Sequence, residues 1–131
     1  MIVWKEEFVT GIPIIDEQHR KLFEMGERLY GMLDRPEASD HSEELKQVLK
    51  ELTGYAKYHF EFEEGLLEAA GYPALEVQER EHKQFFDKIE ELSAKDLEMN
   101  PLETAREILD YVLQWIGTHI LEKDMDYQTY V

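Results

Sequence analysis

Four of the five histidines lie on apolar stripes with helical spacing, each in a different stretch of the chain. A hydrogen-bonded place in a protein core would explain any one of them alone. Burying four such rings separately demands four sets of polar partners, whereas one metal site satisfies all four. The four are His19, His59, His82 and His119; His41, in a polar link, is interpreted as exposed and without function.

Two carboxylates extend this pattern. Glu63 follows His59 by four residues, so both side chains share one helix face, where a buried glutamate needs a cation or strong donors to stay charged. Asp124 follows His119 by five residues, which is about 140° around an ideal helix. Asp124 can therefore join the site only if the helix ends or unwinds, and the polar run LEKDMD favours such an ending.

The donor types narrow the choice of metal. Imidazoles and carboxylates without sulfur suit iron, manganese or zinc. The sequence contains no cysteine, which excludes disulfides and thiolate ligands. Two facing groups of histidines joined by carboxylates suit a dinuclear centre inside a helical bundle.

Four amphipathic helices are predicted to position these residues, at about 17–35, 42–70, 74–95 and 102–121. Asp16 is the predicted N-cap of the first helix, and residues 1–15 are predicted to form an extended N-terminal arm. Short links between the helices indicate one all-α domain over residues 1–131, an up-down-up-down four-helix bundle.

Composition excludes several classes of function. The 131-residue chain has 30 acidic and 14 basic side chains and a formal net charge of −16, so it should repel nucleic acids and anionic membrane surfaces. Charge appears too early for a signal peptide, and no apolar run approaches the ~20 residues of a membrane span. We expect a cytoplasmic protein that works as a monomer.

Further motifs strengthen the pattern, and with them the chain resembles the hemerythrins, in particular bacterial single-domain members, over essentially its whole length. The family pattern is a histidine on the first helix, H-x-x-x-E on the second, H-x-x-x-H on the third and H-x-x-x-x-D at the end of the fourth. Flanking marks that agree are Trp4, Phe8, Gly11 and Ile12 at the start, the turn at Tyr72 and Pro73, Trp115, and Tyr127.

This resemblance implies a non-heme di-iron centre with an oxo or hydroxo bridge that binds dioxygen. His19 and His59 would hold the iron with the open dioxygen position. Glu63 and Asp124 would bridge both irons. The resemblance also allows a separate redox partner that reduces the iron.

The second iron departs from the family pattern. His82 and His119 would hold it, but Gln78 stands where a third histidine is expected. The Gln78 amide oxygen could bind weakly, Gln78 could hold a water, or Glu79 could replace it through the Glu-x-x-His spacing of di-iron carboxylate proteins. A weak or exchangeable position at Gln78 is favoured, and it should speed autoxidation.

Two function classes follow, and a bundle that has lost one or both metals is a third reading. The first is a dioxygen-binding protein for storage, delivery or sensing. The alternative is a di-iron enzyme with oxidase-like, peroxidase-like or nitric-oxide-directed activity at the opened iron. In either case a dry wall should protect the bound gas, formed by Leu22, Phe60, Trp115, Ile116 and Ile120.

Overall fold

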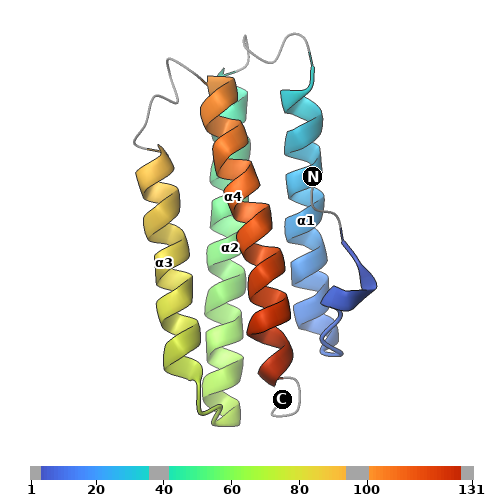
Figure 1. Ribbon diagram of the computed structural model, residues 1–131, viewed down its shortest axis with the longest axis vertical. Coiled ribbons are helices and arrows are strands. Elements are labelled where there is room, and N and C mark those ends of the chain that lie inside the picture. Colours follow the sequence, from blue (N-terminus) through green and yellow to red (C-terminus); the bar gives the residue numbers. More distant parts are fainter. Residues whose placement is uncertain (1–3, 36–41, 94–100, 128–131) are drawn as a thin grey trace.

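Four antiparallel helices dominate the computed structural model, which describes residues 4–35, 42–93 and 101–127. The chain runs up, down, up and down through the bundle (Figure 1), and this confirms the predicted all-α architecture. Two 3₁₀ turns accompany the helices, η1 (Glu6–Phe8) before the first and η3 (Asp124–Tyr127) after the last. The helices are α1 (Pro13–Leu33), α2 (Ser42–Ala70), α3 (Leu75–Ser93) and α4 (Pro101–Glu122).

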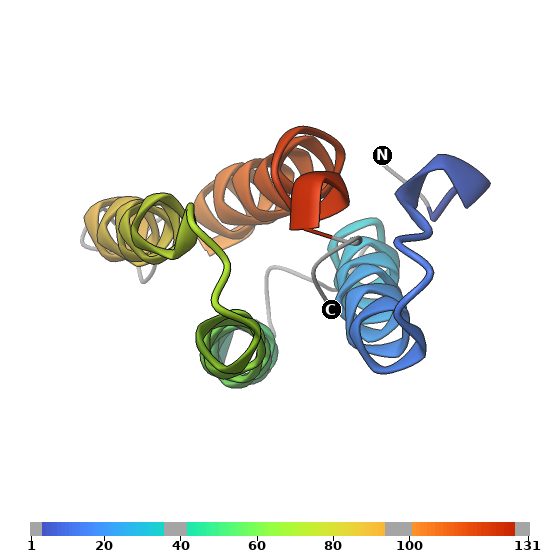
Figure 2. The same ribbon diagram turned by 90° about the horizontal axis from the view of Figure 1, so that it is seen from below.

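Seen along the bundle, the helices stand at the corners of a distorted square (Figure 2). Helix α1 neighbours α2 and α4, and α3 neighbours the same two helices from the opposite corner. Inward side chains of all four helices can therefore meet on the bundle axis.

The first helix begins at Pro13 and ends at Leu33, earlier at both ends than the predicted range of about 17–35. Pro13 occupies its first turn, and Ile12 is the N-cap without a side-chain hydrogen bond. Asp16 is thus not the N-cap but lies inside the helix. Its carboxylate accepts hydrogen bonds from the Thr10 amide (2.8 Å), the Thr10 hydroxyl (2.7 Å) and the Gly11 amide (3.1 Å), which fastens the arm to α1. The arm also contains η1, so it is not extended throughout.

The other three helices agree closely with their predicted ranges. Helix α2 has the predicted bounds, and α4 is one residue longer at each end. Helix α3 begins one residue later than predicted, and its predicted end at 94–95 lies outside the described residues, as does His41.

A glycine closes α2 and reverses the chain into α3. The Tyr72 amide donates to the Leu67 carbonyl (3.0 Å) and the Gly71 amide to that of Glu68 (3.1 Å). This pair of bonds requires a left-handed residue, and Gly71 supplies it with φ of 69°. The turn places the start of α3 beside the end of α2, where the candidate ligands lie.

Apolar side chains fill the bundle beyond the end that contains the candidate ligands. Core members include Leu29, Leu52, Phe85, Ile108, Leu109 and Val112. Gly26 lets α1 approach α4 closely, because a Cβ there would lie 2.6 Å from Cδ2 of Leu113.

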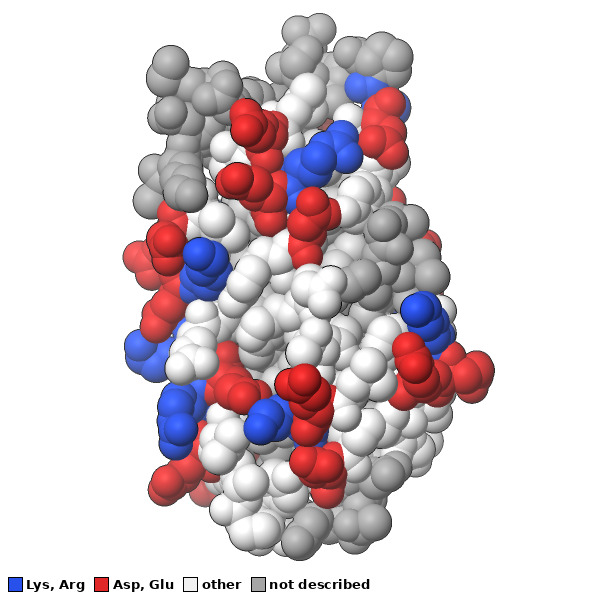
Figure 3. All heavy atoms as spheres, in the orientation of Figure 1, with Lys and Arg blue, Asp and Glu red and all other residues white. Residues whose placement is uncertain are grey.

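On the face shown in Figure 3, acidic and basic side chains are interspersed and do not gather into a basic patch. Among the described residues, no helix is both long and apolar enough to span a membrane.

Candidate metal centre

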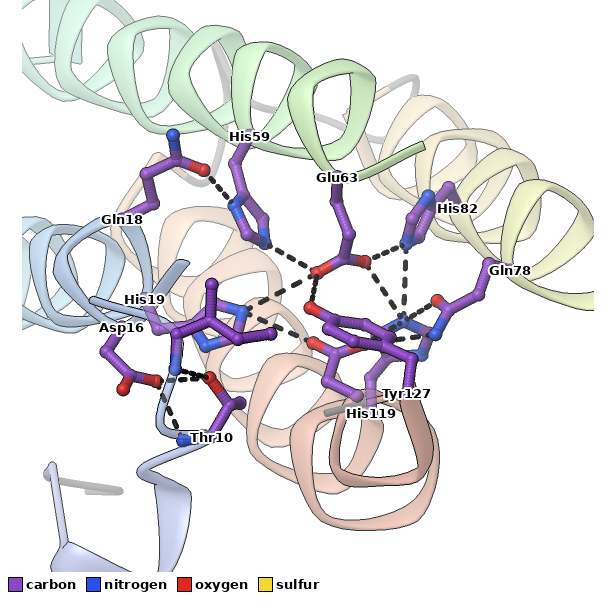
Figure 4. Close-up of polar contacts among 12 residues, drawn as sticks. Thr10, Asp16, Gln18, His19, His59, Glu63, Gln78, His82, His119 and Tyr127 are labelled. Carbon is purple, nitrogen blue, oxygen red and sulfur yellow. Dashed lines mark hydrogen bonds and ion pairs between the residues drawn. The ribbon is translucent and has the colours of Figure 1, made fainter. Parts of the chain in front are cut away.

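All seven predicted ligand side chains are buried in the bundle and contact one another. Those labelled in Figure 4 point toward one another from the four helices. Each of these side chains is at most 5% exposed. Helix α1 supplies His19, α2 supplies His59 and Glu63, α3 supplies Gln78 and His82, and α4 with η3 supplies His119 and Asp124.

Glu63 stands between two groups of imidazoles. Its Oε2 atom lies 3.4 Å from Nε2 of His59 and 3.9 Å from Nε2 of His19. Its Oε1 atom lies 3.1 Å from Nε2 of His82 and 4.0 Å from Nε2 of His119. Each carboxylate oxygen therefore faces a different histidine pair.

Asp124 repeats this arrangement from the other side. Helix α4 ends at Glu122 and η3 begins at Asp124, so the chain departs from α-helical geometry where the sequence required it to. Oδ2 of Asp124 lies 3.2 Å from Nε2 of His19, and Oδ1 lies 3.2 Å from Nε2 of His119.

The site consequently has two halves. The α1/α2 half comprises His19 and His59 with Glu63 Oε2 and Asp124 Oδ2; the α3/α4 half comprises Gln78, His82 and His119 with Glu63 Oε1 and Asp124 Oδ1. In the second half the Nε2 atoms of His82 and His119 are 3.2 Å apart. The Gln78 amide oxygen lies 2.7 Å from Nε2 of His119, and its NH₂ group donates to Asp124 Oδ1 at 3.2 Å.

Polar contacts on the outer side of three rings, two hydrogen bonds and one ion pair, fix which nitrogen faces inward. Nδ1 of His59 contacts the Gln18 amide oxygen (2.6 Å), Nδ1 of His82 contacts Glu64 (2.8 Å), and Nδ1 of His119 contacts Glu81 (3.0 Å). The Gln18 and Glu64 oxygens accept from Nδ1–H of His59 and His82, and Glu81 forms an ion pair with Nδ1 of His119. In each ring this leaves Nε2 to serve as the metal donor.

Sequence reasoning missed these three partners. Each is next in sequence to a predicted ligand, yet it contacts a ligand on the following helix. Only the packed arrangement reveals that pattern. Tyr127 was noticed only as a family mark, but its buried hydroxyl donates to Oε2 of Glu63 at 2.8 Å.

The site's electrostatics favour ionised carboxylates. Burial would raise the pKa of Glu63, but the adjacent His59 and His82 imidazoles outweigh it and hold that pKa well below the usual value. Burial and the Glu63 charge oppose ionisation of Asp124, yet His119 and His19 lower its pKa.

The two histidines that show clear shifts differ in direction. Burial lowers the pKa of His59 despite the nearby Glu63 charge. Burial acts the same way on His119, but Asp124, Glu63 and Glu81 outweigh it and raise its pKa. The nearby carboxylates therefore outweigh burial at His119 but not at His59.

Unsatisfied atoms test whether this donor set fits a metal. Oε1 of Glu63 and Oδ2 of Asp124 are buried and accept no hydrogen bond, although each faces an imidazole nitrogen. Among the described residues, their ion pairs are all with histidines, so no lysine or arginine neutralises them. One cation in each half would satisfy both oxygens, and a set of histidines and carboxylates suits iron, manganese or zinc.

Comparison with known proteins agrees with this geometry. The family model for the hemerythrin HHE cation binding domain matches residues 10–131. The chain belongs to the hemerythrin family. It is 39% identical over 127 residues to a bacteriohemerythrin of Clostridium acetobutylicum, covering 97% of this chain and 98% of the relative. A bacteriohemerythrin of Pseudomonas aeruginosa is 29% identical over 126 residues, covering 96% and 78% respectively.

Aromatic rings of this hemerythrin-family chain shield the α3/α4 half. Phe60 stacks on His82 with ring centroids 4.0 Å apart, and Trp115 stacks on His119 at 4.4 Å. Leu22, Ile116 and Ile120 are buried in the core. Trp115 is only partly buried, so the predicted dry wall reaches the surface there.

Gln78 and Glu79 lie differently relative to the centre. Gln78 is 1% exposed and points into the centre, whereas Glu79 is exposed. Glu79 belongs to neither cluster of possible metal ligands found among the described residues. It lines a surface pocket of about 520 Å³ between α2 and α3, whose wall also includes Phe60 and His82.

Proposed function

We propose that this chain holds two iron ions between its helices and binds dioxygen for storage, delivery or sensing. The observation that carries the proposal is the pair of buried carboxylates, Glu63 and Asp124, each turning one oxygen to each half of the site. Family membership supports the same conclusion. When bound, the iron pair supplies the electrons that dioxygen takes up, and an oxo or hydroxo bridge is part of the proposal.

The donor inventory differs between halves and suggests where the gas binds. The α1/α2 half offers two imidazole nitrogens, from His19 and His59, besides the carboxylate oxygens. The α3/α4 half adds the Gln78 amide oxygen to its two imidazoles. We assign the open dioxygen position to the α1/α2 half because it has fewer protein donors.

Gln78 should make the α3/α4 half weaker than three imidazoles would. A neutral amide oxygen is a poorer donor toward iron than imidazole, so water or another small ligand can exchange at this position. Its NH₂ group is also engaged by Asp124. We therefore propose faster autoxidation than in a relative with histidine at this position.

Anaerobic reconstitution with ferrous iron, followed by repeated oxygenation and deoxygenation, tests the proposal. The expected result is two irons per chain and a visible charge-transfer band that appears with dioxygen and disappears on its removal. Irreversible conversion to a ferric product on the first exposure to dioxygen would contradict reversible binding.

A di-iron enzyme acting on peroxide or nitric oxide is the second candidate. The pocket of about 520 Å³ whose wall includes His82 favours it, because this pocket brings a surface cavity up to the outer side of a residue of the α3/α4 half. Multiple turnovers of peroxide with a reducing dye, lost in Gln78→His, would move this function to first place. Stoichiometric consumption alone would reject it.

A further inference from the structure

Three outer contacts to the histidines, two hydrogen bonds and one ion pair, form an ordered series around the bundle. Gln18 on α1 holds His59 on α2, Glu64 on α2 holds His82 on α3, and Glu81 on α3 holds His119 on α4. Each contact joins one helix to the next along the chain. The series therefore fixes ring orientation and helix packing together.

Charge in this series is distributed unequally. Both imidazoles of the α3/α4 half rest on carboxylates, from Glu64 and Glu81. In the α1/α2 half, His59 rests on the neutral amide of Gln18, and Nδ1 of His19 has no hydrogen-bond partner among the described residues. The α3/α4 half has the amide of Gln78 where a third imidazole is expected. Its two imidazoles, of His82 and His119, are the ones that contact carboxylates on their outer side.

A carboxylate behind a metal-bound imidazole raises its basicity and fixes its tautomer. Glu64 and Glu81 are only 28% and 29% exposed, so solvent screens them incompletely. Nζ of Lys123 lies 3.8 Å from Oε1 of Glu81 and forms an ion pair with it. Glu63 and Asp124 lie in the centre, and Glu64 and Glu81 lie behind the rings of the α3/α4 half, where Lys123 offsets part of the Glu81 charge.

We propose that Glu64 and Glu81 are positioning residues. Through His82 and His119 they strengthen binding of the metal ion in the α3/α4 half, and this compensates for the weak donor Gln78. This inference rests on the proposed dinuclear site but not on dioxygen binding. Glu64 and Glu81 make the imidazoles of His82 and His119 stronger donors. They also favour the higher oxidation state of an iron held there.

Cobalt(II) titration of the metal-free full-length chain tests the proposal without dioxygen. The wild type is expected to bind two equivalents. Glu64→Gln and Glu81→Gln retain an acceptor for Nδ1–H and remove only the charge. Each substitution should lower the affinity for one of the two cobalt ions by about 10- to 100-fold, the usual effect of losing an outer partner of a metal ligand. The affinity for the other cobalt ion should stay unchanged.

Glu79→Gln is the matched control, since it removes the same charge from an exposed side chain of α3 in the same pocket as Glu64. It should bind both equivalents like the wild type. Adding Gln78→His to Glu81→Gln should restore the weakened equivalent, because the new imidazole enters the same half. Because Gln78→His alone should also strengthen this equivalent, the decisive quantity is the loss caused by Glu81→Gln in each background. Compensation predicts a smaller loss in the Gln78→His background than in the wild type, whereas independent effects predict equal losses.

The midpoint potential of the iron-loaded chain provides a second measurement. Glu64→Gln should raise the potential of one iron, because removal of negative charge favours the ferrous state. Wild-type cobalt affinities in both glutamine variants, an equal loss in Glu79→Gln, or uptake of only one equivalent by the wild type would each overturn the inference. A wild type that binds two cobalt ions, but no dioxygen after iron loading, would refute only the proposed function.

Discussion

The amide oxygen of Gln78 lies 2.7 Å from Nε2 of His119, so side chains from α3 and α4 converge on one point of the centre. The same amide donates to Asp124, which ties Gln78 to a carboxylate that contacts both halves. Gln78 is thus built into the site and does not simply leave a gap there. Its replacement should change metal chemistry more than folding.

Gln78→His is expected to slow autoxidation and to strengthen binding of the ion in the α3/α4 half, because an imidazole is the better donor. An affinity gain on the order of tenfold or more is expected, since even outer partners of metal ligands alter affinity by 10- to 100-fold. Autoxidation is followed in the visible spectrum and affinity by cobalt(II) titration. Gln78→Leu, which cannot bind metal, should change both quantities in the opposite direction, and unchanged values in both variants would contradict the prediction.

Gly26→Ala should destabilise the bundle by about 1–3 kcal/mol, the usual cost of overpacking a core. The new methyl group would meet Leu113, which is fully buried between the helices. Gly31→Ala is the matched control on the same helix, because nothing lies within 4 Å of its added Cβ. The control should gain up to about 1 kcal/mol from helix propensity. Urea unfolding of the metal-free proteins measures both, and equal stabilities would reject the close α1–α4 approach.

Tyr30 on α1 and Asp110 on α4 should make stability fall at alkaline pH. Burial, together with the hydrogen bond and charge of Asp110, raises the pKa of Tyr30 from 10.0 to about 12. Below pH 10 both folded and unfolded chains keep the phenolic proton. Between these two pKa values only the unfolded chain loses it, so this contribution to stability falls as pH rises.

Ultraviolet titration of tyrosine in the wild type and in Tyr30→Phe isolates the Tyr30 signal by difference. Asp110→Asn should move that signal back toward the ordinary value, because it removes a negative charge that opposes phenolate formation. An unchanged midpoint in Asp110→Asn would show that the carboxylate does not control Tyr30.

Much of the fold could be predicted because helical periodicity reports which face is buried. The stripes containing His19, His59, His82 and His119 placed one imidazole on each helix, and the structure brings them together. The start of α1 was misplaced because Asp16 has the chemistry of an N-cap. Tertiary contacts with Thr10 instead make it an anchor for the arm.

The partners of the histidines were harder to predict. Glu64 and Glu81 sit among many acidic residues, and periodicity gives no reason to choose them. Their roles depend on contacts between neighbouring helices, which a linear pattern does not encode. Asp124 could be predicted only conditionally, because its role depended on where α4 ended.

Tyr127→Phe should destabilise the metal-free chain by about 1–3 kcal/mol, because it removes a buried donor to a charged oxygen of Glu63. Burial and the charges of Asp124 and Glu63 raise the pKa of Tyr127, so the hydroxyl stays protonated and keeps donating. Chemical unfolding in the presence of a chelator measures the loss. Tyr58→Phe, at a position 54% exposed, should have little effect. Equal stabilities of the two variants would contradict a structural role for the Tyr127 hydroxyl.

Glu63→Gln should weaken uptake of both metal ions, whereas His59→Ala should weaken only one. The reason is geometric: the two oxygens of Glu63 face different halves, while His59 belongs to the α1/α2 half alone. Gln retains the size of the side chain but loses the charge that a bridging ligand supplies. A two-step cobalt(II) titration, with metal-to-protein ratios after desalting, separates the outcomes, and helical circular dichroism checks that both variants fold. If Glu63→Gln lost only one equivalent, the carboxylate would serve a single ion and the bridging assignment would fail.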